Sequence, residues 1–284
     1  FRINKQYRNL KRYRDIIGVL FKYGFDEILE RLHIEDYLWI GKNFFKSFKK
    51  TEPRVSFATR LRLAFEELGP TFIKLGQILS TRPYLLPANI ISELSLLQDK
   101  VAFIPFPQIK AIIEEELNQP LEEVFEWINE TAEASASIAQ VHRARLKDGR
   151  DVIIKVQKPE IKKIIYADMD ILHDLSRLLV RYIPESRQFD PEEIVKELKR
   201  TIFNELNFLN EARNIEIFAR NFNNDQTVYV PKVYFDLCTE RVLIMERIEG
   251  IKISNLETLD KEKIYDRELI AKRGGHFVLK QIFR

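Results

Sequence analysis

The chain has 284 residues, 45% of them apolar, which is enough to bury one or two substantial cores. Its 46 basic and 43 acidic residues nearly cancel to a formal charge of +3, so the composition does not suggest wholesale binding to nucleic acid. The single cysteine, Cys238, excludes an internal disulfide, and no apolar run reaches the ~18 residues that a membrane span needs.

Residues 1–55 are predicted to form a basic and aromatic helical segment. Apolar residues recur at helical spacing from Ile3 to Phe21, and basic residues crowd the same stretch. Lys42 to Lys50 mixes three phenylalanines with four lysines. Either the segment lies on an anionic membrane surface, or it packs on the rest of the protein with a solvated basic face. Nucleic-acid binding is the weaker alternative, because no base-reading module accompanies the segment.

Residues 56–130 are predicted to form a helical extension. Gly69-Pro70 ends one helix and starts the next, which carries Lys74-Leu75-Gly76-Gln77. Lys74 and Gln77 are three positions apart and share a helix face. Gly76 costs the helix about 1 kcal/mol relative to alanine, so we expect another element to approach its backbone closely. Three further helices are predicted to serve packing alone: Pro87 to Gln98, Gln108 to Leu117 and Leu121 to Ile128.

A β-hairpin forms the centre of the next region. Asp148-Gly149 is a strong hairpin signal, and it separates strands predicted from Gln140 to Leu146 and from Asp151 to Val156. The second strand ends in Val152-Ile153-Ile154-Lys155, which is similar to the V-A-I-K strand of kinases. The stretch before the hairpin has alanines and a valine where a kinase nucleotide loop has glycines and a valine: Ala134, Ala136, Ala139 and Val141.

These motifs together carry a family resemblance. Ala-Ser-Ala-Ser-Ile-Ala-Gln-Val-His resembles the alanine-rich loop of the UbiB-type (AarF/UbiB) atypical kinases, a protein-kinase-like family tied to coenzyme Q biosynthesis, and Lys74 to Gln77 is similar to its K-x-G-Q signature. The resemblance covers the chain from about Phe57 onward. It implies an α+β fold: a kinase-like N-lobe of antiparallel sheet plus helices at 131–250, after a helical extension that folds over the nucleotide pocket. Residues 251–284 would begin a C-lobe that is truncated here.

The resemblance also implies a nucleotide site for ATP or ADP. Lys155 would reach the phosphates and Ile153 the base, while Met245, Glu246 and Ile248 would form the back of the pocket and the linker between lobes. The loop residues Ser135 and Ser137 either contact phosphate or only form turns. Alanine at positions 134, 136 and 139 disfavours positive φ and keeps backbone N–H groups further from an anion. We therefore expect altered nucleotide preference and poor phosphoryl transfer to proteins.

Asp190-Pro191-Glu192-Glu193 predicts a helix start in which Asp190 caps, Pro191 occupies the first turn and Glu193 completes a capping box. The helix expected after it carries two glutamates that could hold lysines. Glu205 and Glu211 are six positions apart, about 240° around a helix, so they cannot face one partner. We assign Glu211 to Lys155 and Glu205 to the Lys74 segment, with the swap as the alternative. Asn207 departs from the family, which has aspartate there. Strands are predicted from Thr227 to Phe235 and from Arg241 to Met245.

The last residues and the histidines limit the catalytic and metal-binding chemistry that we expect of this chain. No Asp-Phe-Gly or catalytic-loop His-x-Asp occurs, so the ligands of Mg²⁺ are expected beyond residue 284, and the chain, taken as a fragment, is predicted to be catalytically silent. His33, His142, His173 and His276 show no metal-ligand spacing, so we predict no metal site built from these residues.

The function expected from the resemblance is an ATP-binding kinase or ATPase that supports quinone or other isoprenoid-lipid metabolism. It would act in the cytoplasm, at the periphery of a bacterial inner membrane or an organellar equivalent, with an isoprenoid lipid, a membrane surface or quinone-biosynthesis proteins as partners and no nucleic acid. The alternatives are a nucleotide-sensing scaffold that binds ATP, ADP or lipid without catalysis, and a helical interaction module.

Overall fold

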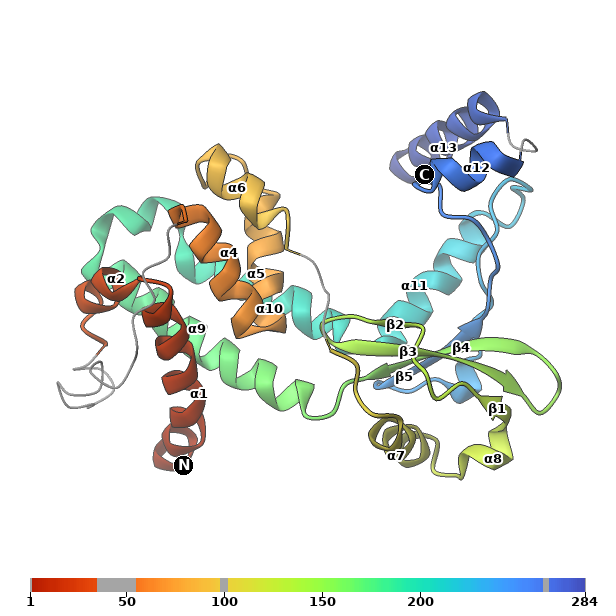
Figure 1. The fold of residues 1–284 in the computed structure, drawn as a ribbon, viewed down its shortest axis with the longest axis horizontal. Helices are drawn as coiled ribbons and strands as arrows, with labels where there is room; N and C mark the ends of the chain where they lie inside the picture. The colour runs from red at the N-terminus through yellow and green to blue at the C-terminus, as the bar shows by residue number, and fades with distance from the viewer. Residues whose placement is uncertain (1, 35–54, 98–101, 263–265, 284) are drawn as a thin grey trace. The chain divides into compact units, whose positions relative to one another are not determined.

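The structure is a computed structural model that describes residues 2–34, 55–97, 102–262 and 266–283 (Figure 1). It divides into two compact units built from separated stretches of chain. We call them the helical unit (Phe1–Ile109, Ala134–Gln140 and Gln157–Leu206) and the sheet unit (Lys110–Glu133, Val141–Val156 and Asn207–Arg284). The segments expected from the sequence were contiguous, whereas each unit combines three stretches. The predicted Lys42 to Lys50 stretch lies outside the described residues.

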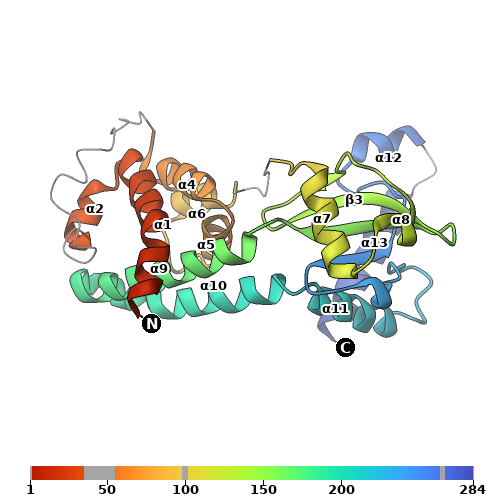
Figure 2. The same cartoon turned by 90° about the horizontal axis from the view of Figure 1, so that it is seen from below.

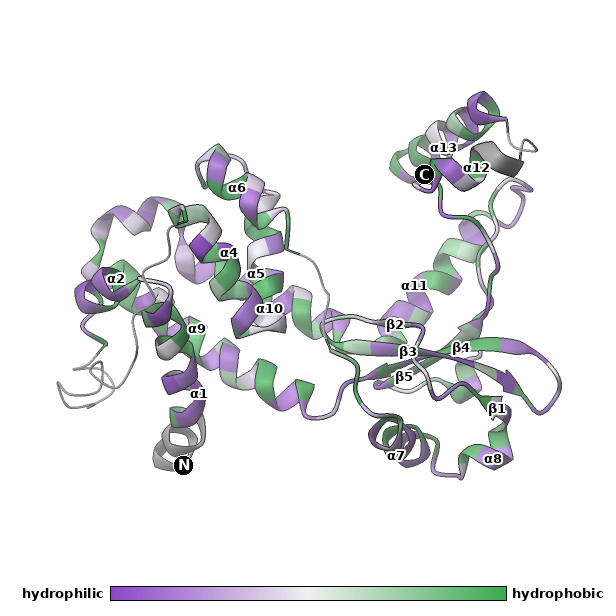
Figure 3. Cartoon of the chain, viewed as in Figure 1, coloured by the Kyte–Doolittle hydropathy of each residue, from purple (hydrophilic) through white to green (hydrophobic). Residues whose placement is uncertain are grey.

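The helical unit contains most of the helices. Its elements are α1 (Arg2–Lys22), α2 (Asp26–Arg31), α4 (Phe57–Leu68), α5 (Pro70–Ser80), α6 (Ala88–Leu94), α9 (Ile161–Tyr182), the 3₁₀ helix η2 (Pro184–Phe189), α10 (Pro191–Glu205) and the short strand β2 (Ala134–Ser135). Long amphipathic helices α9 and α10 lie side by side, with apolar and polar positions mixed along each (Figures 1 and 3). Ile165, Met169 and Leu172 of α9 enter the core at helical spacing.

Helix α1 is held on this unit by a buried carboxylate. Asp168 of α9 is fully buried, and Arg12 Nε donates to its Oδ1 at 2.6 Å. Arg12 Nη2 also donates to the carbonyl oxygen of Leu68 at 2.6 Å, which satisfies the end of α4. Ile16 and Ile17 are 0% and 1% exposed, so the apolar face of α1 is used for packing at these positions. No helix in the described parts of the chain has the length and apolarity to span a bilayer.

The start of α5 follows the sequence prediction. Ser56 caps α4 by accepting a hydrogen bond from Thr59 N, and Gly69, at φ +93°, connects α4 to Pro70 in the first turn of α5. A β-carbon at Gly76 would lie 2.2 Å from Cδ1 of Leu97 and 2.9 Å from Cδ2 of Phe65. The expected close approach to Gly76 is therefore confirmed, and the partners are apolar side chains.

The sheet unit is built around an antiparallel sheet with the strand order β1-β3-β4-β5, and β2 also pairs with β3. Its elements are α7 (Phe106–Leu117, which begins in the helical unit), α8 (Leu121–Val124), β1 (Phe125–Ile128), β3 (Ala139–Leu146), β4 (Asp151–Gln157), α11 (Phe208–Asn221), the 3₁₀ helix η3 (Phe235–Leu237), β5 (Val242–Glu246), α12 (Leu256–Glu262) and α13 (Arg267–Ile282). Gly149, at φ +87°, makes the predicted turn between β3 and β4, which are joined by the four residues 147–150.

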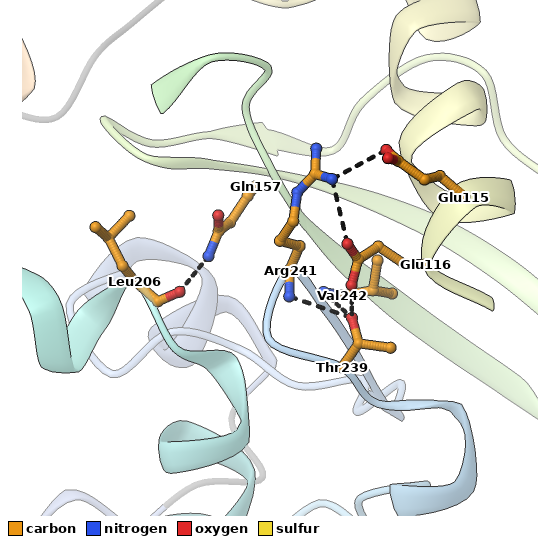
Figure 4. A network of polar contacts seen from close by, with 7 residues as sticks. All are labelled: Glu115, Glu116, Gln157, Leu206, Thr239, Arg241 and Val242. Atoms are coloured by element: carbon orange, nitrogen blue, oxygen red, sulfur yellow. Dashed lines mark hydrogen bonds and ion pairs between the residues drawn. The ribbon is translucent and has the colours of Figure 1, made fainter. Parts of the chain in front are cut away.

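Arg241 fixes α7 beside the start of β5. Its Nη1 lies 3.0 Å from Glu115 Oε2 and 3.2 Å from Glu116 Oε1 (Figure 4). Thr239 Oγ1 donates to Glu116 Oε2 at 2.5 Å and accepts from Val242 N at 3.1 Å. One guanidinium and one hydroxyl thus join the helix to the strand, an arrangement that the sequence analysis did not foresee.

Three predicted elements differ from the structure. Residues 125–128 form β1 rather than the end of a helix, because alternating Phe125 and Trp127 pair with β3. No strand spans 227–235, where only Val233 bridges to Met245; Pro231 lacks the N–H that a strand ladder uses. The helix expected to run through both Glu205 and Glu211 is broken between α10 and α11.

The capping box expected at Asp190 is half formed. The Asp190 side chain accepts from Glu193 N at 3.2 Å, as predicted. The Glu193 carboxylate does not return the bond; it pairs with Lys196 at 2.9 Å. The helix start is therefore correct, and the reciprocal part of the box is wrong.

Candidate functional site: a lysine on a strand held by a helix carboxylate

Strand β4 presents Lys155 on the less buried face of the sheet. Val152, Ile154 and Val156 are fully buried, and Ile153 and Lys155 alternate with them as half-buried side chains. Lys155 Nζ lies 2.9 Å from Oε1 and 2.6 Å from Oε2 of Glu211. The two side chains remain 24% and 36% exposed, so the ion pair is accessible from solvent. This is the pairing expected for Lys155.

Helix α11 begins where it does because Asn207 caps it. The Asn207 side chain accepts from Leu209 N at 3.0 Å, and Phe208 N donates to the carbonyl oxygen of Glu240 at 3.0 Å. Phe208 is fully buried, and its ring lies 4.9 Å from Lys155 Nζ. Glu211 follows in the first turn, where the helix dipole favours a carboxylate. Asparagine and aspartate both serve as N-caps, so Asn207 preserves this structural role in place of aspartate.

The residues expected to face a nucleotide base lie beside Lys155. Ile153 is opposite Met245 in the β4–β5 register, and Lys155 is opposite Leu243. Met245 and Val141 are half-buried, and Ile248 is 48% exposed. The Glu246 carboxylate accepts hydrogen bonds from Tyr229 Oη at 2.5 Å and Lys232 N at 3.0 Å, and the bond from Tyr229 raises the pKa of that phenol. Glu246 therefore has partners of its own within the sheet unit.

A set of ion pairs surrounds the sheet, and the sequence analysis missed it. Arg143 Nε lies 2.7 Å from Glu133 Oε2, and this guanidinium lowers the pKa of the Glu133 carboxyl. Arg145 pairs with Asp151 across the hairpin at 2.7 Å. These arginines occupy the alternating half-buried positions of β3, so the period-two pattern of the strand was the signal that could have found them.

In the helical unit, the predicted Lys74 and Glu205 also form an ion pair. Lys74 Nζ lies 2.6 Å from Glu205 Oε1, which joins α5 to the last residue of α10. Gln77 Nε2 lies 3.5 Å from the carbonyl oxygen of Leu97. Both glutamates thus have the partners assigned to them. Glu205 and Glu211 face different partners because they lie on separate helices, α10 and α11, and not because of the angle between two positions on one helix.

The alanine-rich loop has ordinary backbone geometry. None of Ala134, Ala136 and Ala139 has positive φ, which agrees with the expectation that alanine disfavours it. Ala136 N donates to the carbonyl oxygen of Ala139 at 2.8 Å and closes a tight turn that contains Ser137. Ser135 Oγ donates to the carbonyl oxygen of Ala102 at 3.4 Å. The alanine methyl groups, rather than an unusual backbone, are therefore what distinguishes this loop from a glycine-rich loop.

Buried polar side chains anchor the loop within the helical unit. Gln140 is 1% exposed, accepts from Ile104 N at 2.8 Å and donates to Ile104 O at 3.0 Å. Lys158 is 6% exposed and donates to the carbonyl oxygen of Ala102 at 3.3 Å; burial lowers the pKa of its ammonium. Gln157 donates to the carbonyl oxygen of Leu206 at the end of α10 (Figure 4). Sequence reasoning missed all three.

The described residues contain no cluster of three His, Cys, Asp or Glu side chains that could hold a metal ion. His142 is fully buried, with Nδ1 2.8 Å from the carbonyl oxygen of Asn129, and burial lowers the pKa of this imidazole. Cys238 is half-buried, and desolvation raises the pKa of its thiol. These groups have structural surroundings rather than the shared geometry of a metal centre.

A strand lysine paired with the carboxylate of a neighbouring helix, on an antiparallel sheet, defines the N-terminal lobe of a protein-kinase-like fold. Residues 96–284 match the ABC1 atypical kinase-like domain, so the chain belongs to this family. The expected resemblance to UbiB-type kinases and the expected fold class are both confirmed.

Relatives of known name support the same placement. The chain is 42% identical over 281 residues to a probable protein kinase UbiB from Aeromonas salmonicida, covering 98% of this chain and 51% of that protein. It is 43% identical over 279 residues to a probable protein kinase UbiB from Erwinia tasmaniensis, covering 97% and 50%. The chain thus spans about half the length of these curated relatives. A solved structure, the complex of Rv3197 with erythromycin from Mycobacterium tuberculosis, is similar with a TM-score of 0.50 and 28% identity, over 70% of this chain and 50% of that one.

Proposed function

We propose that the chain binds ATP or ADP through Lys155 and serves as the nucleotide-binding part of an atypical kinase or ATPase. The ion pair between Lys155 and Glu211 carries the proposal. Two of the three N–H donors of Lys155 point to Glu211, so the third can reach a phosphate oxygen. The carboxylate holds the ammonium in place and fixes its direction, which is what phosphate binding in a kinase-like lobe requires.

The neighbouring side chains suit the rest of a nucleotide. Ile153 and Met245 are paired across β4 and β5 and offer an apolar surface for a flat base. Backbone groups after Met245 would meet the edge of the base. Mg²⁺, when bound, would neutralise phosphate charge. We assign Mg²⁺ no ligands among the described residues. The contacts proposed above join the chain to the nucleotide itself.

The wider role we propose is support of ubiquinone or other isoprenoid-lipid metabolism at a membrane surface. The UbiB names of the relatives and the basic, aromatic residues near the N-terminus support this role. Its test is the ubiquinone content of cells whose gene carries Lys155→Ala. We expect less quinone than in cells with the unaltered gene, and an equal content would contradict the role.

A thermal-shift assay tests the binding proposal. A ligand that binds only the folded state raises the melting temperature, by an amount equivalent to about 2.7 kcal/mol at a hundred times its Kd. We expect Mg-ATP to raise the melting temperature of the unaltered chain and to leave that of Lys155→Ala nearly unchanged. Lys162→Ala, a lysine outside the proposed site, is the control and should respond like the unaltered chain. Equal shifts in all three proteins would contradict the proposal.

The alternative is a nucleotide-sensing scaffold that binds ATP or ADP without phosphoryl transfer. The absence of Asp-Phe-Gly from these 284 residues favours it for the chain taken alone. Binding of ATP with no release of phosphate by the chain would agree with this alternative. Steady release of phosphate that Lys155→Ala abolishes would favour the enzyme.

A further inference from the structure

Helix α13 contacts the rest of the sheet unit through one narrow face. Among its described residues only Ile270, Phe277 and Lys280 are half-buried, and the others are exposed. Their spacing of seven and three residues places them on one side of a helix. Leu269, Val278 and Leu279, by contrast, are 43–54% exposed. The contact face of α13 is therefore defined by Ile270, Phe277 and Lys280.

This face meets the C-terminal end of α11. The ring of Phe277 lies 5.8 Å from that of Phe218 and 5.3 Å from that of Phe222, and the two α11 rings are 4.7 Å apart. Phe222 is 5% exposed, so this aromatic trio is a packed contact rather than a surface encounter. Figure 2 shows α11 and α13 next to one another.

A charge pair closes the same contact. Lys280 Nζ lies 2.5 Å from Asp225 Oδ2, and the two side chains are 29% and 13% exposed. The other oxygen of Asp225 accepts from Thr227 N at 3.0 Å and from Thr227 Oγ1 at 2.6 Å. With both oxygens occupied, Asp225 is a directed partner for Lys280, and these bonds, led by that from Lys280, lower the pKa of its carboxyl strongly.

The opposite end of α11 carries Glu211. Near that end Phe208 and Ala212 are buried, whereas from Arg213 onward most residues of the helix are exposed, among them Arg213, Asn214, Glu216, Ile217 and Arg220. The first half is fixed to the sheet, and the second half is fixed by the aromatic trio and the Asp225–Lys280 pair. A helix of 14 residues is about 20 Å long and moves as one rod, so a change at either end tilts the other.

We infer that Asp225 and Lys280 are positioning residues: by clamping the far end of α11 to α13, they set where Glu211 holds Lys155. The inference rests on the proposed function, because it assigns the clamp a role in nucleotide binding through Lys155. It also makes a structural claim about α11 that can be measured without a nucleotide.

The first experiment measures Mg-ATP affinity by calorimetry in Lys280→Met and Asp225→Asn. We expect each to weaken binding by roughly three- to tenfold, the range for coupling through packed elements. Lys272→Met is the matched control, because Lys272 lies on the same helix and forms an ion pair with Glu268 on its solvent face, with both side chains more than 70% exposed. We expect no change for Lys272→Met. Affinity unchanged in Lys280→Met with circular dichroism intact would overturn the inference.

Two further measurements separate positioning from general destabilisation. The double charge swap Asp225→Lys with Lys280→Asp should restore most of the lost affinity. In a Glu211→Gln background, whose affinity is lowered but still measurable, Lys280→Met should cause no further loss, because the clamp acts through Glu211. A further loss of the same size in that background would overturn the inference and show a merely structural effect.

Hydrogen exchange decides the case in which the unaltered chain binds no nucleotide. That result would contradict the proposed function alone. The inference would still predict faster exchange of the amides from Glu211 to Ile215 in Lys280→Met than in Lys272→Met. Equal exchange in the two variants would overturn it.

Discussion

Lys155 and Glu211 combine a short contact with considerable exposure. Ion pairs that water can reach contribute about 0–1 kcal/mol to folding, so this pair has little value as a support of the fold. A buried apolar pair would stabilise the sheet more. The presence of two charged groups on the face of β4 that also carries Ile153 is explained if a phosphate contacts the Lys155 ammonium.

Replacing Glu211 tests this division between binding and stability. We expect Glu211→Gln to weaken Mg-ATP binding about tenfold, because the amide holds the ammonium less firmly, and to change the free energy of unfolding by less than about 1 kcal/mol. Calorimetry and urea titration measure the two quantities. Glu216→Gln, in an exposed ion pair with Arg220 on the same helix, is the control and should alter neither. A large loss of stability with unchanged affinity would contradict the account.

His142 gives a pH dependence with a defined sign. Burial lowers the pKa of its imidazole in the folded chain below the ~6.5 of an unfolded one, so unfolding takes up a proton at acid pH. The contribution to stability is complete above about pH 6.5 and is lost as the pH falls toward the folded-state pKa. Urea titrations at pH 7.5 and 5.5 should show this loss in the unaltered chain and in His173→Gln, an exposed control, and a smaller loss in His142→Gln. The same loss in His142→Gln would contradict the prediction.

Among the elements, α5 shows why a helix tolerates glycine. Alanine at Gly76 would gain the helix about 1 kcal/mol but drive a methyl group into Leu97 and Phe65, and overpacking costs about 1–3 kcal/mol. We expect Gly76→Ala to lower the free energy of unfolding by about 1 kcal/mol. Gly274→Ala in α13, where nothing lies within 4 Å, should raise it by up to about 1 kcal/mol. Equal stabilisation by both substitutions in urea titrations would contradict this reading of α5.

The alanine-rich loop has a prediction of its own. Ala139 is 1% exposed, has negative φ and closes the turn to Ala136. Ala139→Gly removes a buried methyl group and adds backbone freedom without relieving strain. We therefore expect the affinities for ATP and ADP to change, as measured by calorimetry, with Ala132→Gly as a control outside the turn. Unchanged affinity for both nucleotides would show that the methyl group does not act on the phosphates.

The elements also show what the sequence could predict. The hairpin at Gly149 and the junction at Gly69-Pro70 follow local rules of turn and cap chemistry, and both were predicted close to their observed bounds. β1 was missed because Phe125 and Trp127 are fixed by pairing with β3, and short apolar runs fit a helix or a strand equally well. The break at Asn207 was missed because the residues on both sides favour helix.

Across the whole molecule, some side-chain partners could be predicted from the sequence and others could not. The lysine–glutamate pairs could be assigned because the family resemblance supplied the lysines and glutamates, and the structure then gave the distances. Gln140, Gln157, Arg241 and the Asp225–Lys280 pair join residues far apart in sequence, and nothing in local periodicity specifies such partners. The composition of the two units from separated stretches could not be predicted for the same reason.

The central claim is that the ammonium of Lys155 contacts the phosphates of a bound nucleotide. An acyl-phosphate derivative of ATP tests it most directly, because an amine beside the phosphates attacks the acyl carbonyl, keeps the acyl group as an amide and releases the nucleotide. Mass spectrometry of the labelled chain should find the acyl group on Lys155, and excess ATP or ADP should prevent its transfer. Labelling spread over exposed lysines such as Lys163 and Lys196, unaffected by excess nucleotide and sparing Lys155, would contradict the account.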